Sequence, residues 1–224
     1  GHGNYHCLVL APSSVQEMCD LTMKAFELAF KYRNPAIVLA DAVLGQMMEF
    51  LELPGKEMPR PDTASWAVQG DAATRGNLVS SIYLDNDLQE RHNWTLQGKY
   101  EAMEQDATAE RYLTEDAEIV LTGYGTSSRV ARSAVDELRA QGVKAGLFRP
   151  VTLFPFPAAE LNMAAHSGRV LVVELSNGQY RDDVLLHLDR ERGQKVGLVN
   201  RMGGNMMRVE DVTRAAMGMM EARA

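Results

Sequence analysis

The chain has 224 residues and a formal net charge of -7, from 23 Lys and Arg against 30 Asp and Glu. This acidic balance argues against a nucleic-acid or anionic-membrane surface and favours proteins and small molecules as partners. No apolar run approaches the roughly 20 residues of a membrane-spanning helix, and nothing at the start resembles a signal peptide, so we expect a cytoplasmic protein. Cys7 and Cys19 are too few for a disulfide framework or a metal cluster.

The first fifty residues predict one strand, helix and strand unit. Residues 8–10 are a short apolar strand, residues 12–14 end it and cap a helix, and Asn34-Pro35 ends that helix. The next run, 36–44, is rich in Val and Ile, as a parallel strand buried on both faces should be. Two strands do not make a stable sheet. We therefore expect the remaining strands on sequence absent here, and the opening at GHGNY without an initiator Met favours a piece of a longer polypeptide.

The rest of the chain predicts a connector followed by an alternating α/β segment. Residues 52–85 are interrupted by prolines and lack periodicity, which indicates a connector lying along the surface, and residues 86–113 favour a long polar bridging helix. From residue 117 onward, strands and helices alternate four times, which predicts a separate α/β domain. The expected strands are 118–125, 143–154, 169–177 and 195–200, and the expected helices are 128–142, 157–167, 179–192 and 209–222.

The turn GYGTSS at 123–128 joins a strand to a helix. Gly123 and Gly125 allow the backbone to leave the strand tightly, and Thr126, Ser127 and Ser128 offer oxygens that could cap the helix. Such a helix start collects unpaired N–H groups, which favour an anion. The pattern fits neither GxGxxG nor a Walker loop. It is either a helix-entry turn alone or a site for a phosphate or carboxylate supported by Arg129.

The histidines do not have the spacing of a metal site. His2 and His6 flank Gly3-Asn4-Tyr5 in a loop leading into a core strand, a position from which side chains can line a pocket; simple loop polarity is the alternative. Glu174, at the end of an apolar strand, lies where active-site groups of open α/β sheets collect. It could equally be an interface or helix-capping residue.

Three segments together resemble the alpha subunits of 2-oxoacid:ferredoxin oxidoreductases, nearest the branched-chain 2-oxoisovalerate type. They are GHGNY, the run VLAPSSVQEMCDLTMKAFELAFKYRNPAIVLADAVLGQMME, and GYGTSSRVARSAVDELRAQGVKAGLFRPVTLFPFP. The resemblance implies an α/β fold in three parts. These are the C-terminal part of a thiamine-enzyme pyrimidine-binding domain over 1–50, including its βαβ unit, a connector with a long polar helix over 51–114, and a transketolase C-terminal-like three-layer α/β/α domain over 115–224.

The resemblance also implies the chemistry. Such complexes oxidatively decarboxylate a 2-oxoacid with thiamine diphosphate, transfer the acyl group to coenzyme A, and pass electrons through iron–sulfur clusters to ferredoxin. The activating glutamate would precede Gly1, the diphosphate and Mg²⁺ would lie on the beta subunit, and the clusters on beta or on a ferredoxin-like subunit. We therefore expect no catalytic residue and no bound cofactor on this chain alone, and an oligomer with beta and gamma or delta subunits.

Two groups of candidate site residues follow, one from the resemblance and one from the residues of the turn at 123–128. One matches a stretch that helps form the substrate pocket in related pyruvate enzymes, although no arginine is present in it: His2, Asn4, Tyr5 and His6. The other is a candidate contact for coenzyme A: Gly123, Gly125, Thr126, Ser127, Ser128 and Arg129. The alternative is that residues 115–224 are a docking and dimerisation module without any ligand contact.

Overall fold

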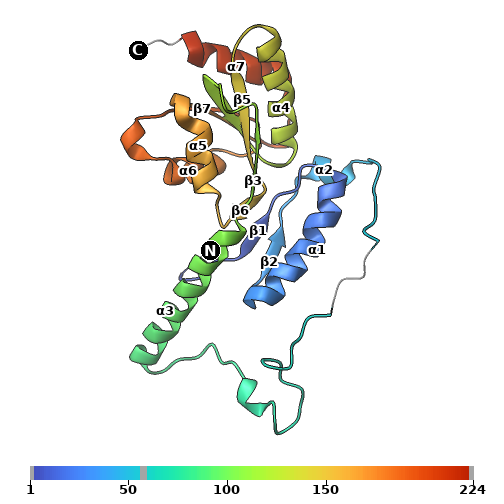
Figure 1. Ribbon diagram of the computed structural model, residues 1–224, viewed down its shortest axis with the longest axis vertical. Helices are drawn as coiled ribbons and strands as arrows, with labels where there is room; N and C mark the ends of the chain where they lie inside the picture. Colours follow the sequence, from blue (N-terminus) through green and yellow to red (C-terminus); the bar gives the residue numbers. More distant parts are fainter. Residues whose placement is uncertain (1–2, 56–59, 222–224) are drawn as a thin grey trace.

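The computed structural model describes residues 3–55 and 60–221, except the side chain of Arg190. The chain forms two sheets (Figure 1), one of three strands in the order β2-β1-β6 and one of five strands in the order β3-β5-β4-β7-β8. This α/β architecture agrees with the expected fold class. No helix within the described ranges is long and apolar enough to cross a membrane.

The first sheet is built around β1 (Leu8–Leu10), which pairs in parallel with β2 (Ala36–Val38). The crossover between them is α1 (Val15–Tyr32), whose first turn is capped by Ser14, because its hydroxyl accepts the Glu17 N–H at 3.1 Å. The predicted cap at residues 12–14 is therefore confirmed. The helix ends at Arg33, which adopts a left-handed conformation with φ of 47° before Asn34-Pro35.

The predicted strand over 36–44 is wrong beyond Val38. The chain turns at residues 39–41 and enters a short helix, α2 (Ala42–Gln46), because the Asp41 carboxylate accepts the N–H groups of Val43 and Leu44. The expectation of burial on both faces is also wrong. β2 is the edge of its sheet, and Ile37 in its middle is 44% exposed.

The predicted strand over 143–154 is two strands in two different sheets. β5 (Ala145–Pro150) belongs to the five-stranded sheet, whereas β6 (Thr152–Phe154) pairs antiparallel with β1. The break lies at Val151, whose N–H binds Thr108 O and whose carbonyl accepts the Ala11 N–H. The first sheet therefore receives its third strand from the C-terminal half of the same chain.

The second sheet contains β3 (Ala109–Tyr112), β4 (Ile119–Thr122), β5, β7 (Arg169–Glu174) and β8 (Lys195–Asn200). Neighbouring strands are parallel except β3, which runs antiparallel to β5. β3 lies within the segment predicted as a bridging helix, since α3 (Asn86–Met103) ends six residues before it. The expected strands and helices from residue 117 onward are confirmed in type and order, apart from the split at Val151.

Helices cover both faces of the second sheet. α4 (Gly125–Ala140) and α7 (Val209–Glu221) pack on one face, and α5 (Ala158–Ala164) and α6 (Gln179–His187) pack on the other. β4 is buried along its whole length, with Ile119 and Leu121 in the first core and Val120 in the second. Burial of each such side chain stabilises the fold by about 1.5–3 kcal/mol. Short 3₁₀ turns complete the chain: η1 (Arg75–Asn77), η2 (Glu104–Asp106), η3 (Ala165–Ser167) and η4 (Arg190–Arg192).

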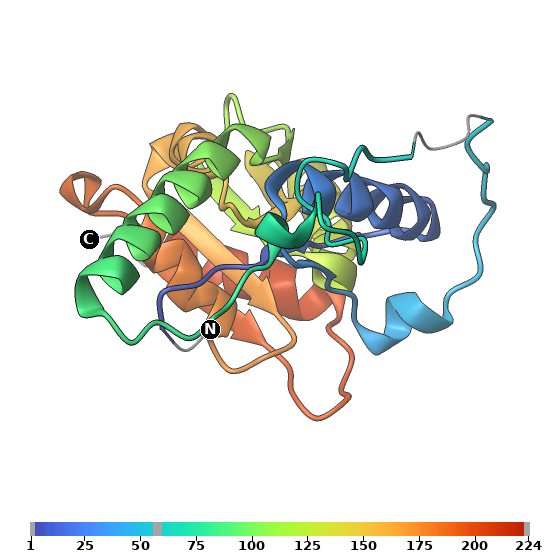
Figure 2. The ribbon, with the colours of Figure 1, turned by 90° about the horizontal axis from the view of Figure 1, so that it is seen from below.

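The connector between α2 and α3 swings out as a wide loop (Figures 1 and 2), and η1 is the one helical turn in its described residues. Trp66 packs on α1, with its ring 6.3 Å from that of Phe30 and 4.9 Å from the Arg33 guanidinium. The expected lack of regular structure is confirmed. The expectation that residues 52–85 lie along the surface fails for much of their length, where large apolar residues face solvent: Leu53, Val68, Leu78, Val79, Ile82 and Leu84.

One buried arginine joins the two sheets. Arg149, near the end of β5, is only 5% exposed. Its Nη1 and Nη2 atoms donate to both carboxylate oxygens of Glu17 on α1, at 3.0 and 2.7 Å, and its Nε donates to Glu110 on β3 at 2.7 Å. Arg132 on α4 pairs with the same Glu110. A planar guanidinium suits this double pairing, because its donors match two carboxylates at once.

Replacement of the buried arginine should cost far more stability than replacement of its exposed neighbour. Arg149→Ala should lower the free energy of unfolding by about 3–5 kcal/mol, because Glu17 is left without its cationic partner and Glu110 keeps only the exposed Arg132. Arg132→Ala is the matched control, since it contacts the same Glu110 but is 46% exposed, and exposed pairs contribute only about 0.2–1 kcal/mol. Urea unfolding measures both; similar small losses would contradict the role of Arg149.

Candidate functional site

The carboxyl ends of β4 and β7 form a crevice in the second sheet. β4 continues through α4 to β5 on one side, whereas β7 lies on the other side of β4 and continues through α6 to β8. α4 and α6 cover opposite faces, so the connections that leave β4 and β7 diverge at this edge of the sheet. Ligands of open α/β sheets commonly bind at such a switch point.

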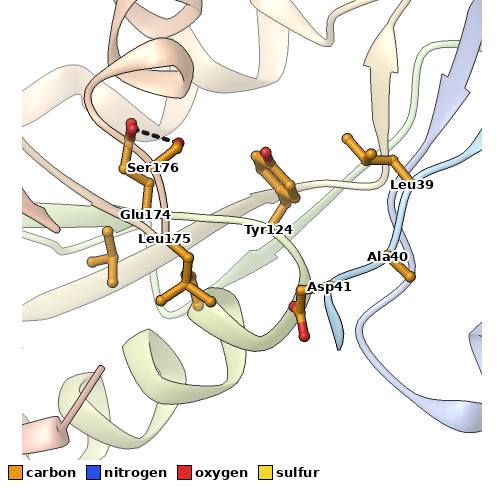
Figure 3. A pocket seen from close by; sticks show the side chains of 9 residues that line it. Leu39, Ala40, Asp41, Tyr124, Glu174, Leu175 and Ser176 are labelled. Atoms are coloured by element: carbon orange, nitrogen blue, oxygen red, sulfur yellow. Dashed lines mark hydrogen bonds between the residues drawn. The ribbon is translucent and has the colours of Figure 1, made fainter. Parts of the chain in front are cut away.

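A cavity of about 170 Å³ occupies this crevice. Figure 3 shows Tyr124 between two groups of side chains, with Glu174 and Ser176 on one side and Leu39, Ala40 and Asp41 on the other. Residues 39–41 follow β2, so the first unit closes a cavity built mainly by the second. The full lining is Leu39, Ala40, Asp41, Tyr124, Ser127, Val173, Glu174, Leu175 and Ser176.

Asp41 caps two helices from different units. Its Oδ1 accepts the Val43 and Leu44 N–H groups of α2, at 3.1 and 2.9 Å. The same carboxylate reaches α4, because Thr126 donates its N–H to Oδ2 at 2.8 Å and its hydroxyl to Oδ1 at 2.6 Å. Both helix N-termini therefore share one negative charge, which their exposed N–H groups stabilise.

The two glycines of the turn make this approach possible. Gly125 has φ of +58°, and a Cβ there would lie 2.8 Å from Asp41 Oδ2. A Cβ on Gly123 would lie 2.7 Å from the backbone oxygen of Val173 on β7. The expected tight exit from the strand is thus present. The two glycines have different roles. Gly125 adopts a left-handed conformation beside Asp41, and Gly123 allows close contact with the neighbouring strand.

Burial of Asp41 would raise its pKa, but the hydrogen bonds from Thr126, Leu44 and Val43 outweigh burial and hold the pKa below its ordinary value. The carboxylate therefore stays ionised at neutral pH and acts as a permanent anion at the start of α4.

The predicted capping role of Thr126, Ser127 and Ser128 is wrong. The N-cap position is Tyr124, which makes no side-chain cap, and the capping oxygen comes from Asp41. The Ser128 hydroxyl donates to Gly125 O at 2.7 Å. Arg129 pairs with Glu49 at 2.8 Å and donates to Ser13 O at 3.1 Å.

The anion that this turn holds is therefore the chain's own carboxylate. Coenzyme A contact at residues 123–129 stays a prediction. It requires a phosphate to displace or share the partners of Thr126 and Arg129.

Glu174 is a helix cap as well as a cavity residue. It is 2% exposed, and its Oε1 accepts from the Ser176 hydroxyl at 2.7 Å and the Gly178 N–H at 2.5 Å, while Oε2 accepts the Arg181 N–H at 2.9 Å. These donors lie at the start of α6, so the capping alternative for Glu174 is confirmed. Beneath it, the buried hydroxyls of Thr122 and Tyr180 lie 2.5 Å apart.

The predicted substrate-pocket residues lie elsewhere. His6 stacks on Phe154 with ring centroids 4.5 Å apart and meets Tyr100 edge-on at 5.0 Å. It lines a cavity of about 850 Å³ under α3 and α6, and also a neighbouring cavity of about 590 Å³ that Asn4 lines. Tyr5 is exposed and belongs to neither lining, and His2 lies outside the described residues.

The walls of these two cavities carry acidic and aromatic side chains. Among the lining residues no Lys or Arg is present, and the carboxylates are Glu90, Glu101, Glu104, Glu160 and Asp183. The structure thus brings His6 and Asn4 together but separates them from the turn at 123–129, which lines the smaller cavity. Across residues 3–55 and 60–221, no three His, Cys, Asp or Glu side chains are placed to hold a metal ion.

Asp41 and Arg149 were not predicted from the sequence. Asp41 lies inside the apolar run AIVLADAVL, where an aspartate followed by helix-forming residues was the available sign of a cap. Nothing local marks Arg149, because Glu17, its main partner, is 132 residues away in the sequence.

Loss of the Asp41 carboxylate should weaken both helices. Each cap contributes about 0.5–2 kcal/mol, so Asp41→Ala should lower the free energy of unfolding by about 1–4 kcal/mol. Because its folded-state pKa lies below the ordinary value of 3.8, this stabilisation is complete above that value and is lost as the pH falls through the folded pKa. Asp41→Asn should therefore flatten the acid dependence of stability below about pH 4.

The control for this comparison is Asp71→Ala, since Asp71 caps only its own exposed turn, through Thr74. Urea unfolding between pH 3 and 7 compares the three variants. An Asp41→Ala loss no larger than that of Asp71→Ala would rule out the double cap.

Two family models together match nearly the whole chain. Residues 3–116 match "Pyruvate flavodoxin/ferredoxin oxidoreductase, thiamine diP-bdg", and residues 117–212 match "Pyruvate:ferredoxin oxidoreductase core domain II". The boundary between them falls just before β4, so β3 belongs to the first matched region although it pairs in the second sheet.

Two relatives are similar to this chain along nearly its whole length. It is 56% identical over 217 residues to ketoisovalerate oxidoreductase subunit VorB of Methanothermobacter marburgensis, covering 96% of this chain and 60% of that protein. It is 30% identical over 248 residues to 2-oxoglutarate synthase subunit KorA of the same organism, covering 97% and 65%. The chain thus spans about three fifths of the length of these relatives.

A solved structure shares the fold. The 2-oxoglutarate:ferredoxin oxidoreductase from Magnetococcus marinus, with 2-oxoglutarate, coenzyme A and succinyl-CoA bound, superposes with a TM-score of 0.69 at 18% identity, covering 99% of this chain and 43% of that chain. At this identity the likeness concerns the fold alone. With the family models matched along residues 3–212, the chain belongs to the pyruvate flavodoxin/ferredoxin oxidoreductase family.

Proposed function

We propose that this chain is part of a subunit of a thiamine diphosphate-dependent 2-oxoacid:ferredoxin oxidoreductase that acts on branched-chain 2-oxoacids. The complex would decarboxylate the 2-oxoacid oxidatively, transfer the acyl group to coenzyme A and pass the electrons to ferredoxin. The observation that carries the proposal is the 56% identity to a ketoisovalerate oxidoreductase subunit along 96% of the chain, against 30% for a 2-oxoglutarate synthase subunit.

In this proposal the chain supplies pocket walls and assembly surface rather than the cofactor's metal or the redox centres. The described residues offer no cluster of metal-binding side chains; Cys7 directly precedes β1, and Cys19 lies in α1. Mg²⁺ with the thiamine diphosphate and the iron–sulfur clusters would be held by the beta and the gamma or delta subunits, as the resemblance implies. The names of the relatives, all described as subunits, support a multi-subunit assembly.

The cavity beside His6 supports an apolar rather than a dicarboxylic substrate. Its walls include the rings of His6, Tyr100, Phe154 and Phe156, and its lining residues include no Lys or Arg. Any carboxylate would find several negative side chains there and no cationic partner among those residues, so the part of the substrate that enters this cavity is its side chain, and the second carboxylate of 2-oxoglutarate would be disfavoured. A short branched aliphatic group can pack on the aromatic rings without that cost.

The assembled complex should prefer 2-oxoisovalerate. We expect kcat/KM for 2-oxoisovalerate to exceed that for 2-oxoglutarate by about tenfold or more, since 1.4 kcal/mol of differential binding corresponds to tenfold. Reduction of ferredoxin, measured with coenzyme A and each 2-oxoacid including pyruvate, makes the comparison. Equal or greater efficiency with 2-oxoglutarate would contradict the branched-chain assignment.

The contribution of His6 is open to a separate test. His6→Ala removes the ring that stacks on Phe154, so it should raise the KM for the 2-oxoacid about tenfold, the order of one lost aromatic contact, and leave the KM for coenzyme A unchanged. His166→Ala is the matched control, since His166 is exposed and contacts Met163 O. Unchanged constants in an intact complex would favour the docking and dimerisation alternative.

A further inference from the structure

The cavity at the switch point of the second sheet has no part in the proposed function. Its lining includes two carboxylates, Asp41 and Glu174, and no Lys, Arg or His. Neither carboxylate takes part in an ion pair with the described residues; backbone N–H groups and hydroxyls satisfy them instead. Oε2 of Glu174 accepts a single hydrogen bond, from Arg181 N, so it has the capacity to accept another.

The environment of this cavity is negative. The pKa of the Tyr124 phenol is raised first by burial and then by the negative charges of Glu174, Asp183 and Asp41. A phosphate or carboxylate entering the cavity would meet the same charges, whereas a cation would be attracted by both carboxylates. The negative electrostatic potential in the cavity therefore disfavours an anionic ligand of the kind that the sequence of the turn suggests.

One buried hydroxyl faces the cavity without a partner. Ser127 is 4% exposed and belongs to the lining. The hydroxyls on either side of it are committed, Thr126 to Asp41 and Ser128 to Gly125 O. Within the part of the chain that the structure describes, the Ser127 hydroxyl makes no hydrogen bond. Its oxygen is open to the cavity, so a ligand inside can form a hydrogen bond with it.

The rest of the wall is aliphatic. Leu39, Ala40, Val173 and Leu175 contribute apolar surface between the two carboxylates, and the described residues contain no cluster that suits a metal ion. A bare metal ion would leave this apolar surface without contacts. An organic cation with a short aliphatic body matches both parts of the wall.

We propose that this cavity binds a small organic ammonium ion on a short aliphatic body. The ammonium group donates hydrogen bonds to the Glu174 carboxylate and to the Ser127 hydroxyl oxygen, on the side of the cavity near Asp41. The aliphatic body packs on Leu39, Val173 and Leu175. The site is distinct from the larger cavity beside His6, and it does not depend on the oxidoreductase assignment.

Three compounds with the same aliphatic body test whether the ligand is a cation, a neutral molecule or an anion. Butylammonium, 1-butanol and butyrate share an aliphatic body and differ in charge, so calorimetric titration of the assembled complex with each compares the headgroups directly. We expect butylammonium to bind about tenfold more tightly than 1-butanol, the effect of a hydrogen bond to a charged group. Butyrate should bind this site least.

Variants assign the binding to this cavity. Ser127→Ala should weaken butylammonium about tenfold, as the loss of one hydrogen bond to a charged group implies, and Ser128→Ala, whose hydroxyl is bonded within the helix, is the matched control. Glu174→Gln should remove most of the preference for butylammonium over 1-butanol. Circular dichroism and thermal unfolding show whether Glu174→Gln keeps its fold; if it does not, Ser127→Ala against Ser128→Ala decides.

Three results would overturn the proposal. One is no measurable binding of butylammonium. Another is binding that Ser127→Ala and Glu174→Gln leave unchanged, which would place the ligand elsewhere. The third is tighter binding of butyrate that Ser127→Ala weakens, which would restore the turn as an anion site.

Discussion

One carboxylate fixes how the two sheets meet. Asp41 lies at the end of the first unit, yet half of its hydrogen bonds go to the start of α4 in the second. The positive end of α4 points to a fixed negative charge, and the left-handed Gly125 leaves room for it. The cavity, the position of residues 39–41 and the entry into α4 all depend on this contact. The chain thus satisfies internally the helix start that its glycine- and hydroxyl-rich turn would otherwise offer to a ligand.

The two units are joined both by the path of the chain, which crosses from one sheet to the other, and by polar contacts. β6 follows β5 after a single residue but pairs with β1 in the other sheet, and Arg149 joins α1, β3 and β5 beside that crossing. The boundary between the two matched family regions at 116 and 117 is therefore a boundary in sequence only. Strands and charges from each region complete the other.

The elements that could be predicted are those whose pattern is local. Strands β4, β7 and β8 are apolar runs bounded by turn residues, and α4 and α7 have an apolar face, so periodicity alone located them. β3 and α2 could not be located in this way, and although residues 152–154 were predicted as strand, their place as β6 in the other sheet was not, because each depends on a partner far away in the sequence. Thr152, for example, is in β6 because β1 offers it an edge, and Asp41 starts a helix inside a run that reads as a strand.

The same distinction holds for the candidate sites. The turn at 123–128 was identified as a place for an anion from its glycines and hydroxyls, and an anion is there. Its source, a side chain 85 residues away, leaves no trace in the turn itself. Glu174 was correctly placed at a strand tip, but its burial and the unpaired Ser127 hydroxyl beside it depend on how α4 and α6 close around the crevice.

The place of β6 has a consequence for synthesis of the chain. β1 and β2 leave the ribosome early, but the third strand of their sheet appears only when residue 154 has been made, after β3, β4 and β5. Until then the free edge of β1, with Leu8 and Leu10 at its core, has no partner from this chain, and unpaired edges of this kind bind other strands readily. This edge of the first sheet is therefore closed only after β3, β4 and β5 of the second sheet have been made, and before β7 and β8.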